Sequence, residues 1–141
     1  MSARVGRTTA GLAVAAALLA TAHGRPAETP RSGAAERGRY LVEQVAMCVE
    51  CHTPRDADGR LLRDRWLQGA PVPVTSPFRG QDWAIEAPGI AGLKGYTEET
   101  GVRLLTEGIA RTGEKLRAPM PPFRLTRDDA EAVVAYLLSL R

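Results

Sequence analysis

The sequence is poor in cysteine and lacks any long uninterrupted hydrophobic run. Cys48 and Cys51 are its only two cysteines among 141 residues. An exported domain that depends on disulfide bonds usually has more cysteines at wider spacing, so we expect this pair to serve another purpose. The longest apolar run, residues 10–20, is shorter than the roughly 20 residues that a membrane-spanning helix needs.

The sequence also lacks an excess of charge of one sign. The formal net charge is +3, but without Arg4 and Arg7 in the N-terminal segment, 17 basic residues face 16 acidic ones. Phosphate binding needs clustered positive charge, so we expect no nucleic-acid partner. With 44% hydrophobic and 25% charged residues, the composition is typical of a soluble globular protein.

Residues 1–22 predict a signal peptide. Arg4 and Arg7 precede the apolar run, and Ala20-Thr21-Ala22 has the small-x-small pattern of a cleavage site. We therefore expect a periplasmic mature chain beginning near His23, with no stable membrane insertion after cleavage. If uncleaved, the same segment would be a membrane anchor. Residues 23–33 are expected to be a flexible leader, and residues 34–141 a single domain.

Three amphipathic helices are expected in this domain, and no long alternating strand pattern competes with them. The first helix should cover residues 35–46. Thr97 should cap the second helix and Gly108 should end it, whereas Thr126 and Asp129 predict a capping box before the third, which reaches almost to Arg141. The buried faces are expected to contain Gly38, Leu41, Val42 and Val45, then Val102, Leu105 and Ile109, then Ala130, Val133, Val134, Leu137 and Leu138.

Residues 53–87 are rich in turn signals, and so long a loop is expected to wrap around another object.

The pattern Cys48-Val49-Glu50-Cys51-His52 is that of c-type haem attachment. Two intervening residues let both sulfurs reach one porphyrin, while His52 follows as a ligand for the iron. A zinc site would need more ligands than this segment offers, and the other histidine, His23, lies in the leader. A dithiol redox centre would need a strand-helix-strand setting that is absent here, and would leave His52 without a purpose.

Met120 is the candidate for the sixth position of the iron, because thioether sulfur is a ligand used in electron-transfer cytochromes. It lies in Ala118-Pro119-Met120-Pro121-Pro122-Phe123, where three prolines restrict the backbone. Met47 directly precedes Cys48, so its short chain path should keep it from the opposite haem face. The alternative for Met120 is a methionine that simply packs in a proline-rich loop.

Cys48 to His52, the Met120 loop and the flanking helices together resemble a class I cytochrome c over residues 34–141. The resemblance implies an all-α fold with three main helices and long loops around one haem c, held by thioethers at Cys48 and Cys51. It also implies His52 and Met120 as axial iron ligands, and first and last helices that cross at Gly38 and Tyr136. Pro88 resembles the family proline whose carbonyl orients the proximal histidine, although Ala87-Pro88-Gly89-Ile90 departs from the usual Gly-Pro-x-Leu.

The implied function is single-electron transfer between periplasmic redox partners such as a dehydrogenase, an oxidase or a reductase, without catalysis by the chain itself. The segment Cys51-His52-Thr53-Pro54-Arg55-Asp56 and the long loop are also similar to cytochrome subunits of periplasmic dehydrogenases, so a fixed complex subunit is one alternative. A gas-binding or catalytic haem protein with a labile sixth ligand is another.

Two groups of side chains near these motifs have open roles. The indole N–H of Trp66 or Trp83 could reach a haem propionate, or the two rings could simply pack. Four basic residues flank Met120 and could either guide docking of a partner or belong to a solvated loop: Arg111, Lys115, Arg117 and Arg124.

Overall fold

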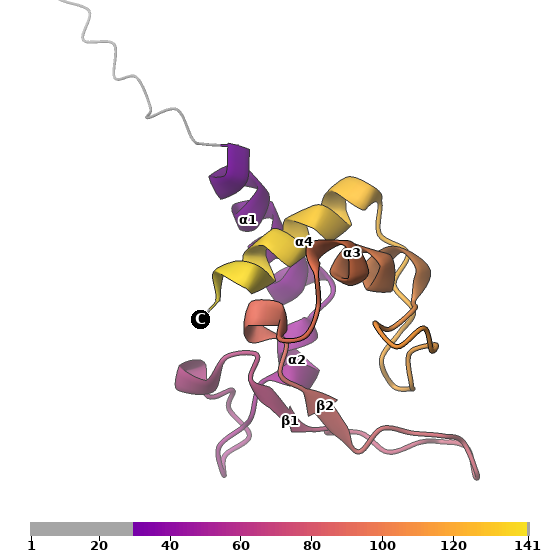
Figure 1. Ribbon diagram of the computed structural model, residues 1–141. Coiled ribbons are helices and arrows are strands. Elements are labelled where there is room, and N and C mark those ends of the chain that lie inside the picture. Colours follow the sequence, from indigo (N-terminus) through magenta and orange to yellow (C-terminus); the bar gives the residue numbers. More distant parts are fainter. Residues whose placement is uncertain (1–29, 141) are drawn as a thin grey trace, which may run out of the picture.

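The computed structural model describes residues 30–140, and the predicted signal peptide lies outside this range (Figure 1). The structure is mostly helical, with long loops and one small sheet, as expected for a cytochrome c fold. In chain order the elements are α1 (Pro30–Tyr40), η1 (Leu41–Val45), α2 (Cys48–His52), η2 (Arg63–Arg65), β1 (Gly69–Pro71), β2 (Glu86–Pro88), η3 (Ala91–Leu93), α3 (Glu98–Glu107) and α4 (Arg127–Ser139).

The first helix differs from the prediction at both ends. It begins at Pro30, inside the segment expected to be a leader, and proline is favoured at a first helical position. Its last turn, η1, is a π-helix, in which the Ala46 N–H donates to the Leu41 carbonyl at 2.8 Å. Leu41 and Val42 are buried as predicted, but Val45 is 55% exposed. The prediction for Val45 was wrong because Val45 lies inside the π turn, whose wider spacing moves its side chains away from the α-helical phase.

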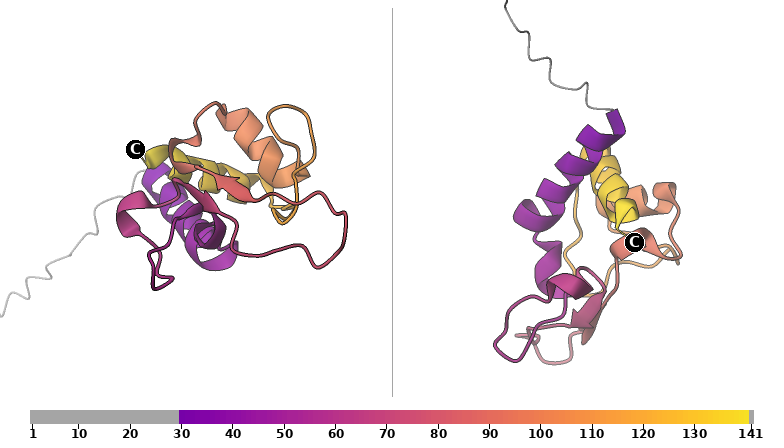
Figure 2. Two further views of the ribbon diagram at one scale, coloured as in Figure 1. Left: turned by 90° about the horizontal axis from the view of Figure 1, so that it is seen from below. Right: turned by 90° about the vertical axis from the view of Figure 1, so that its left-hand side faces the viewer.

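Helices α1 and α4 cross each other (Figure 2). Gly38 lies at the crossing, as the resemblance implied. A Cβ atom on Gly38 would lie 1.9 Å from the Ala132 carbonyl oxygen and 2.8 Å from the Tyr136 Cβ. Only glycine therefore permits this approach of the two backbones. Nearby, the Tyr136 hydroxyl donates a 2.6 Å hydrogen bond to Glu43, which fixes the end of the first helix against α4.

The predicted caps of α3 are present in the structure. The Thr97 hydroxyl accepts a hydrogen bond from the Thr100 N–H at 3.1 Å, the Thr100 hydroxyl accepts one from the Thr97 N–H at 2.9 Å, and Gly108 ends the helix at φ 73°. Val102 and Leu105 are buried, whereas Ile109 lies beyond the end of the helix and is only half-buried.

At α4 the predicted capping box is only half formed. The Thr126 hydroxyl accepts a hydrogen bond from the Asp129 N–H at 3.2 Å. In a complete capping box, the Asp129 carboxylate would bind the Thr126 N–H. Instead, it accepts a 3.0 Å hydrogen bond from Arg37 of α1. Four of the five predicted core residues of α4 are buried, and Leu138 packs at the edge of the core.

The sequence did not predict the antiparallel pair β1 and β2, whose three-residue strands are too short to show alternation. Gly69 pairs with Pro88 and Pro71 with Glu86. The connecting residues 72–85, which we call the arm, extend well beyond both strands and away from the helices (Figures 1 and 2).

Within residues 30–140, no helix has the length and hydrophobicity needed to cross a membrane.

Candidate functional site

The site is built on the short helix α2. Met47 precedes it with a left-handed backbone (φ 51°), and this turn redirects the chain from the first helix into Cys48. Residues three and four positions apart share one face of a helix, so Cys48, Cys51 and His52 are neighbours on α2. All three line the same cavity.

This cavity has a volume of about 570 Å³, within the range of roughly 300–1,000 Å³ found for cofactor and ligand sites. Its walls come from α2, α3, α4, β2 and the loops before and after α3. Apolar side chains predominate, including Val72, Ile90, Leu93, Leu104, Leu105, Leu116, Phe123, Val133, Val134 and Leu137. The cavity is therefore suited to a large, mostly apolar group that the whole domain encloses.

His52 is only 5% exposed, and its Nδ1 lies 2.6 Å from the carbonyl oxygen of Pro88. A carbonyl can only accept a hydrogen bond, so Nδ1 carries the proton and Nε2 keeps a free lone pair. Burial lowers the pKa of His52, and the hydrogen bond to Pro88 opposes this shift only in part. Such a neutral, carbonyl-bonded imidazole is typical of a histidine that binds a metal through its other nitrogen.

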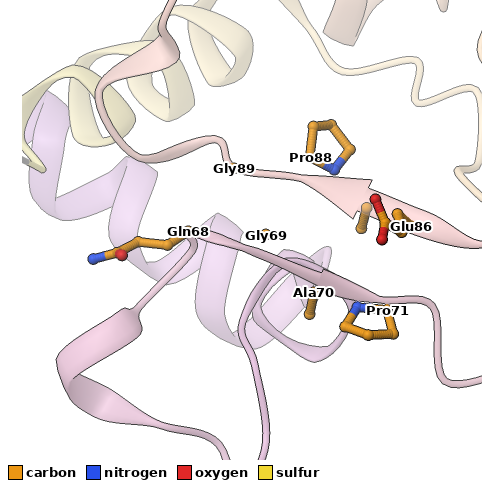
Figure 3. Close-up of a pocket in the computed structure, with 8 residues that line it drawn as sticks. Gln68, Gly69, Ala70, Pro71, Glu86, Pro88 and Gly89 are labelled. Carbon is orange, nitrogen blue, oxygen red and sulfur yellow. The ribbon is translucent and has the colours of Figure 1, made fainter.

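Two glycines fix the position of Pro88. A Cβ on Gly69 of β1 would lie 2.7 Å from the Gly89 nitrogen, and a Cβ on Gly89 would lie 2.8 Å from the Gln68 carbonyl oxygen. Figure 3 shows this close approach of the two strands, beside a smaller cavity of about 320 Å³. The hairpin thus holds the Pro88 carbonyl under His52. The family resemblance implied this role for Pro88, but the strand pair gave no signal in the sequence.

Met120 lies in the cavity wall with Pro119, Pro121 and Phe123. Its N–H donates to the Arg117 carbonyl at 3.1 Å, and the Phe123 N–H donates to the Pro121 carbonyl at 2.9 Å, so this loop is folded on itself. The structure therefore gathers Cys48, Cys51, His52, Met120 and Pro88 around one cavity.

Several residues that the sequence did not predict as site residues also line the cavity. Met47 is part of the lining and is 52% exposed, so it lies at the rim. Lys94, Arg111 and Arg117 also line the cavity, and Glu86 is the one carboxylate among its lining residues. Lys94 gave no signal in the sequence, whereas the two arginines were noticed only as neighbours of Met120.

The two rival uses of the cysteines find little support in the described part of the chain. Residues 30–140 contain no group of three or more His, Cys, Asp or Glu side chains that could hold a metal ion. Burial raises the pKa of Cys48 to about 11, whereas the reactive cysteine of a dithiol redox motif has a lowered pKa. The cavity, its two cysteines and the free Nε2 of His52 together fit haem c.

Neither tryptophan lines the cavity. Trp66 lies against the core, with the Arg63 guanidinium 4.1 Å from its ring. The Trp83 indole N–H donates to the Val74 carbonyl at 3.0 Å, inside the arm. Among the four basic residues near Met120, Arg117 pairs with Asp82 at 3.1 Å.

Comparison with known proteins agrees with this geometry. The family described as cytochrome c oxidase, cbb3-type, subunit III matches residues 33–137. A protein of Cereibacter sphaeroides named "Diheme cytochrome c-type" is 58% identical over 38 residues, which are 27% of this chain and 13% of that protein. The match thus spans only a small part of that longer relative. The chain belongs to this family of c-type cytochromes, and the expected cytochrome c fold is thereby confirmed.

Proposed function

We propose that this chain is an exported monohaem cytochrome that carries single electrons between redox proteins in the periplasm, with axial ligation by His52 and Met120. The observation that carries the proposal is that Cys48, Cys51, His52 and Met120 all line one apolar cavity. Bound haem c would supply reversible one-electron chemistry at its iron.

The residues of the chain have separate parts in this proposal. Cys48 and Cys51 would hold the group through thioethers, and the Nε2 lone pair of His52 would bind the iron. The Pro88 carbonyl keeps the proton of His52 on Nδ1 and fixes the direction of the ring. Met120 would offer a soft sulfur ligand, and the apolar walls would limit the access of water and so help to set the reduction potential.

Three measurements on the purified protein test this function. Haem should stay on the chain in a denaturing gel, and quantification should give one haem per chain. Reduced protein should bind carbon monoxide poorly, since both axial positions are filled. Haem that extracts into acidified organic solvent would refute covalent attachment, and rapid carbon monoxide binding would favour the gas-binding or catalytic alternative.

Export is the part of the proposal that residues 1–22 support. Arg4, Arg7, the apolar run and Ala20-Thr21-Ala22 form a signal peptide pattern. Protein purified from the native host should begin close to His23 and be found in the periplasmic fraction. An N-terminus at Met1 would indicate a retained segment instead.

A fixed subunit of a larger redox complex is a second candidate, because the matching family is described as an oxidase subunit. The chemistry of the chain would be the same, but its electron donor would be a permanent neighbour. Copurification of the tagged protein from its native host separates the two: a stoichiometric complex supports the subunit, and an isolated cytochrome supports the free carrier.

A further inference from the structure

No residue of the arm, 72–85, belongs to the hydrophobic core, yet hydrogen bonds hold the arm in a defined conformation. The Val72 N–H donates to the Ile85 carbonyl at 2.9 Å, and Trp83 donates to the Val74 carbonyl at 3.0 Å. Near the tip, Ser76 and Gln81 share a 2.7 Å hydrogen bond. The arm is therefore an ordered hairpin extension.

This ordered arm presents apolar side chains to solvent. Val74 is 52% exposed, Phe78 68% and Ile85 81%, the last two being the most exposed large apolar side chains in the described part of the chain. Exposed apolar residues gathered on one rigid element are typical of an interaction site, and an aromatic side chain such as Phe78 is a common anchor.

The arm is joined directly to the haem cavity. The Ala84 N–H donates to the Ala118 carbonyl at 2.6 Å, and Asp82 pairs with Arg117 at 3.1 Å, so the arm is tied to the Met120 loop. Val72 and Ala84 themselves line the cavity. A protein that bound the arm would lie beside the redox centre.

Charge identifies the kind of protein that fits. Residues 30–140 contain equal numbers of basic and acidic side chains, but these are unevenly placed. The arm contains one basic and one acidic residue, whereas residues 109–124, which run from the end of α3 past Met120, contain four basic residues and one acidic one. The rest of 30–140 contains ten basic and thirteen acidic residues. The arm itself is thus neutral, but it is tied to a positively charged segment of a chain that is otherwise negative, and this uneven distribution favours an acidic partner.

We propose that the arm and the neighbouring Met120 loop are the docking surface for a redox partner protein whose apolar patch is bordered by carboxylates. This inference rests on the proposed electron-carrier function and adds the surface and the chemistry of the partner. Phe78, Val74 and Ile85 would supply the buried contact. The basic side chains of residues 109–124 would guide the approach.

The first experiment compares variants of the haem-loaded protein. Phe78→Ser with Ile85→Ser should lower the rate at which host periplasmic or membrane fractions reduce the cytochrome about tenfold, as expected when anchor residues are lost. Val74→Ser and Val45→Ser form a matched pair, because the two valines are 52% and 55% exposed but only Val74 lies in the arm. Val74→Ser should slow the reaction and Val45→Ser should not. Reduction by ascorbate should be the same in all of them.

The second experiment identifies what binds. A photoactivatable p-benzoylphenylalanine at position 78 should crosslink to a redox protein with an acidic surface, and added salt should slow reduction of the wild type by the host fraction. Crosslinks only to a second copy of this chain, binding of the arm to phosphatidylglycerol vesicles, or arm variants with wild-type rates would overturn the docking proposal. A wild-type protein that ascorbate reduces but no host fraction reduces would overturn the carrier function itself.

Discussion

The Nδ1 atom of His52 and the carbonyl oxygen of Pro88, 36 positions apart in the sequence, lie 2.6 Å from each other. The hairpin β1–β2 holds this carbonyl in place, and the hairpin in turn depends on Gly69 at φ 94° against Gly89. The direction of the proposed proximal ligand, His52 of α2, is therefore set by a strand pair that lies outside its own helix.

Gly69→Ala should disturb this arrangement, because its Cβ would lie 2.7 Å from the Gly89 nitrogen. A weakened hydrogen bond lowers the basicity of the His52 ring, so ferric iron is less stabilised and the reduction potential should rise. Redox titration measures this change. Gly80→Ala is the control, since Gly80 also has positive φ (74°) but no atom near its Cβ position. Equal potentials in the two variants would contradict the role of Pro88.

Met120→Ala should open the sixth position of the iron without releasing the haem. Thioethers at Cys48 and Cys51 would remain, while water or carbon monoxide would enter the vacated site and the reduction potential should fall, because a more polar site stabilises ferric iron. Absorption spectra with and without carbon monoxide measure this change. Met47→Ala is the control, since Met47 lines the same cavity but is 52% exposed at its rim. If Met47→Ala opens the iron instead, the ligand assignment is wrong.

The two cysteines should contribute separately to haem attachment. Cys48→Ser and Cys51→Ser should each leave one thioether, so haem should remain on denatured protein, with the shifted absorption of a singly attached group. The double variant should lose all haem on a denaturing gel. Retention of haem by the double variant would show attachment elsewhere on the chain.

Gly38→Ala should destabilise the crossing of α1 and α4 by about 3 kcal/mol, since overpacked contacts typically cost 1–3 kcal/mol and this one is with backbone. Its Cβ would lie 1.9 Å from the Ala132 carbonyl oxygen. Gly33→Ala on the same helix meets no atom within 4 Å and should stabilise the helix by up to about 1 kcal/mol. Urea unfolding of the haem-loaded proteins measures both values, and similar losses in the two would argue against this packing.

Tyr136 should make the stability depend on alkaline pH. Burial, followed by the hydrogen bond to Glu43, raises the pKa of Tyr136 from 10.0 to about 12. Between these values the unfolded chain ionises while the folded chain keeps its proton. The stabilisation is therefore complete below pH 10 and is lost as the pH rises towards 12, by about 1–2 kcal/mol.

Tyr136→Phe tests this dependence. It should cost about 1 kcal/mol at neutral pH through the lost hydrogen bond to Glu43. It should also remove the alkaline decline assigned to Tyr136, which urea midpoints at several pH values would reveal. A decline of equal size in the variant would mean that another group titrates there.

The local features of this protein were determined by its sequence. The pattern from Cys48 to His52, the Thr97 and Thr126 caps and the apolar stripes of α3 and α4 each involve residues a few positions apart, and helix geometry alone brings such residues together. These local patterns, together with the family resemblance, predicted the fold class and the candidate haem-binding residues.

The tertiary structure decided the contacts between distant segments. Asp129 binds Arg37, 92 positions away, instead of completing its own capping box, because the crossing at Gly38 brings α1 within reach. The π turn that exposes Val45 and the strand pair that places Pro88 under His52 left no periodic pattern in the sequence. Such features depend on where packing places whole elements relative to one another, and propensity and periodicity describe only the neighbourhood of each residue along the chain.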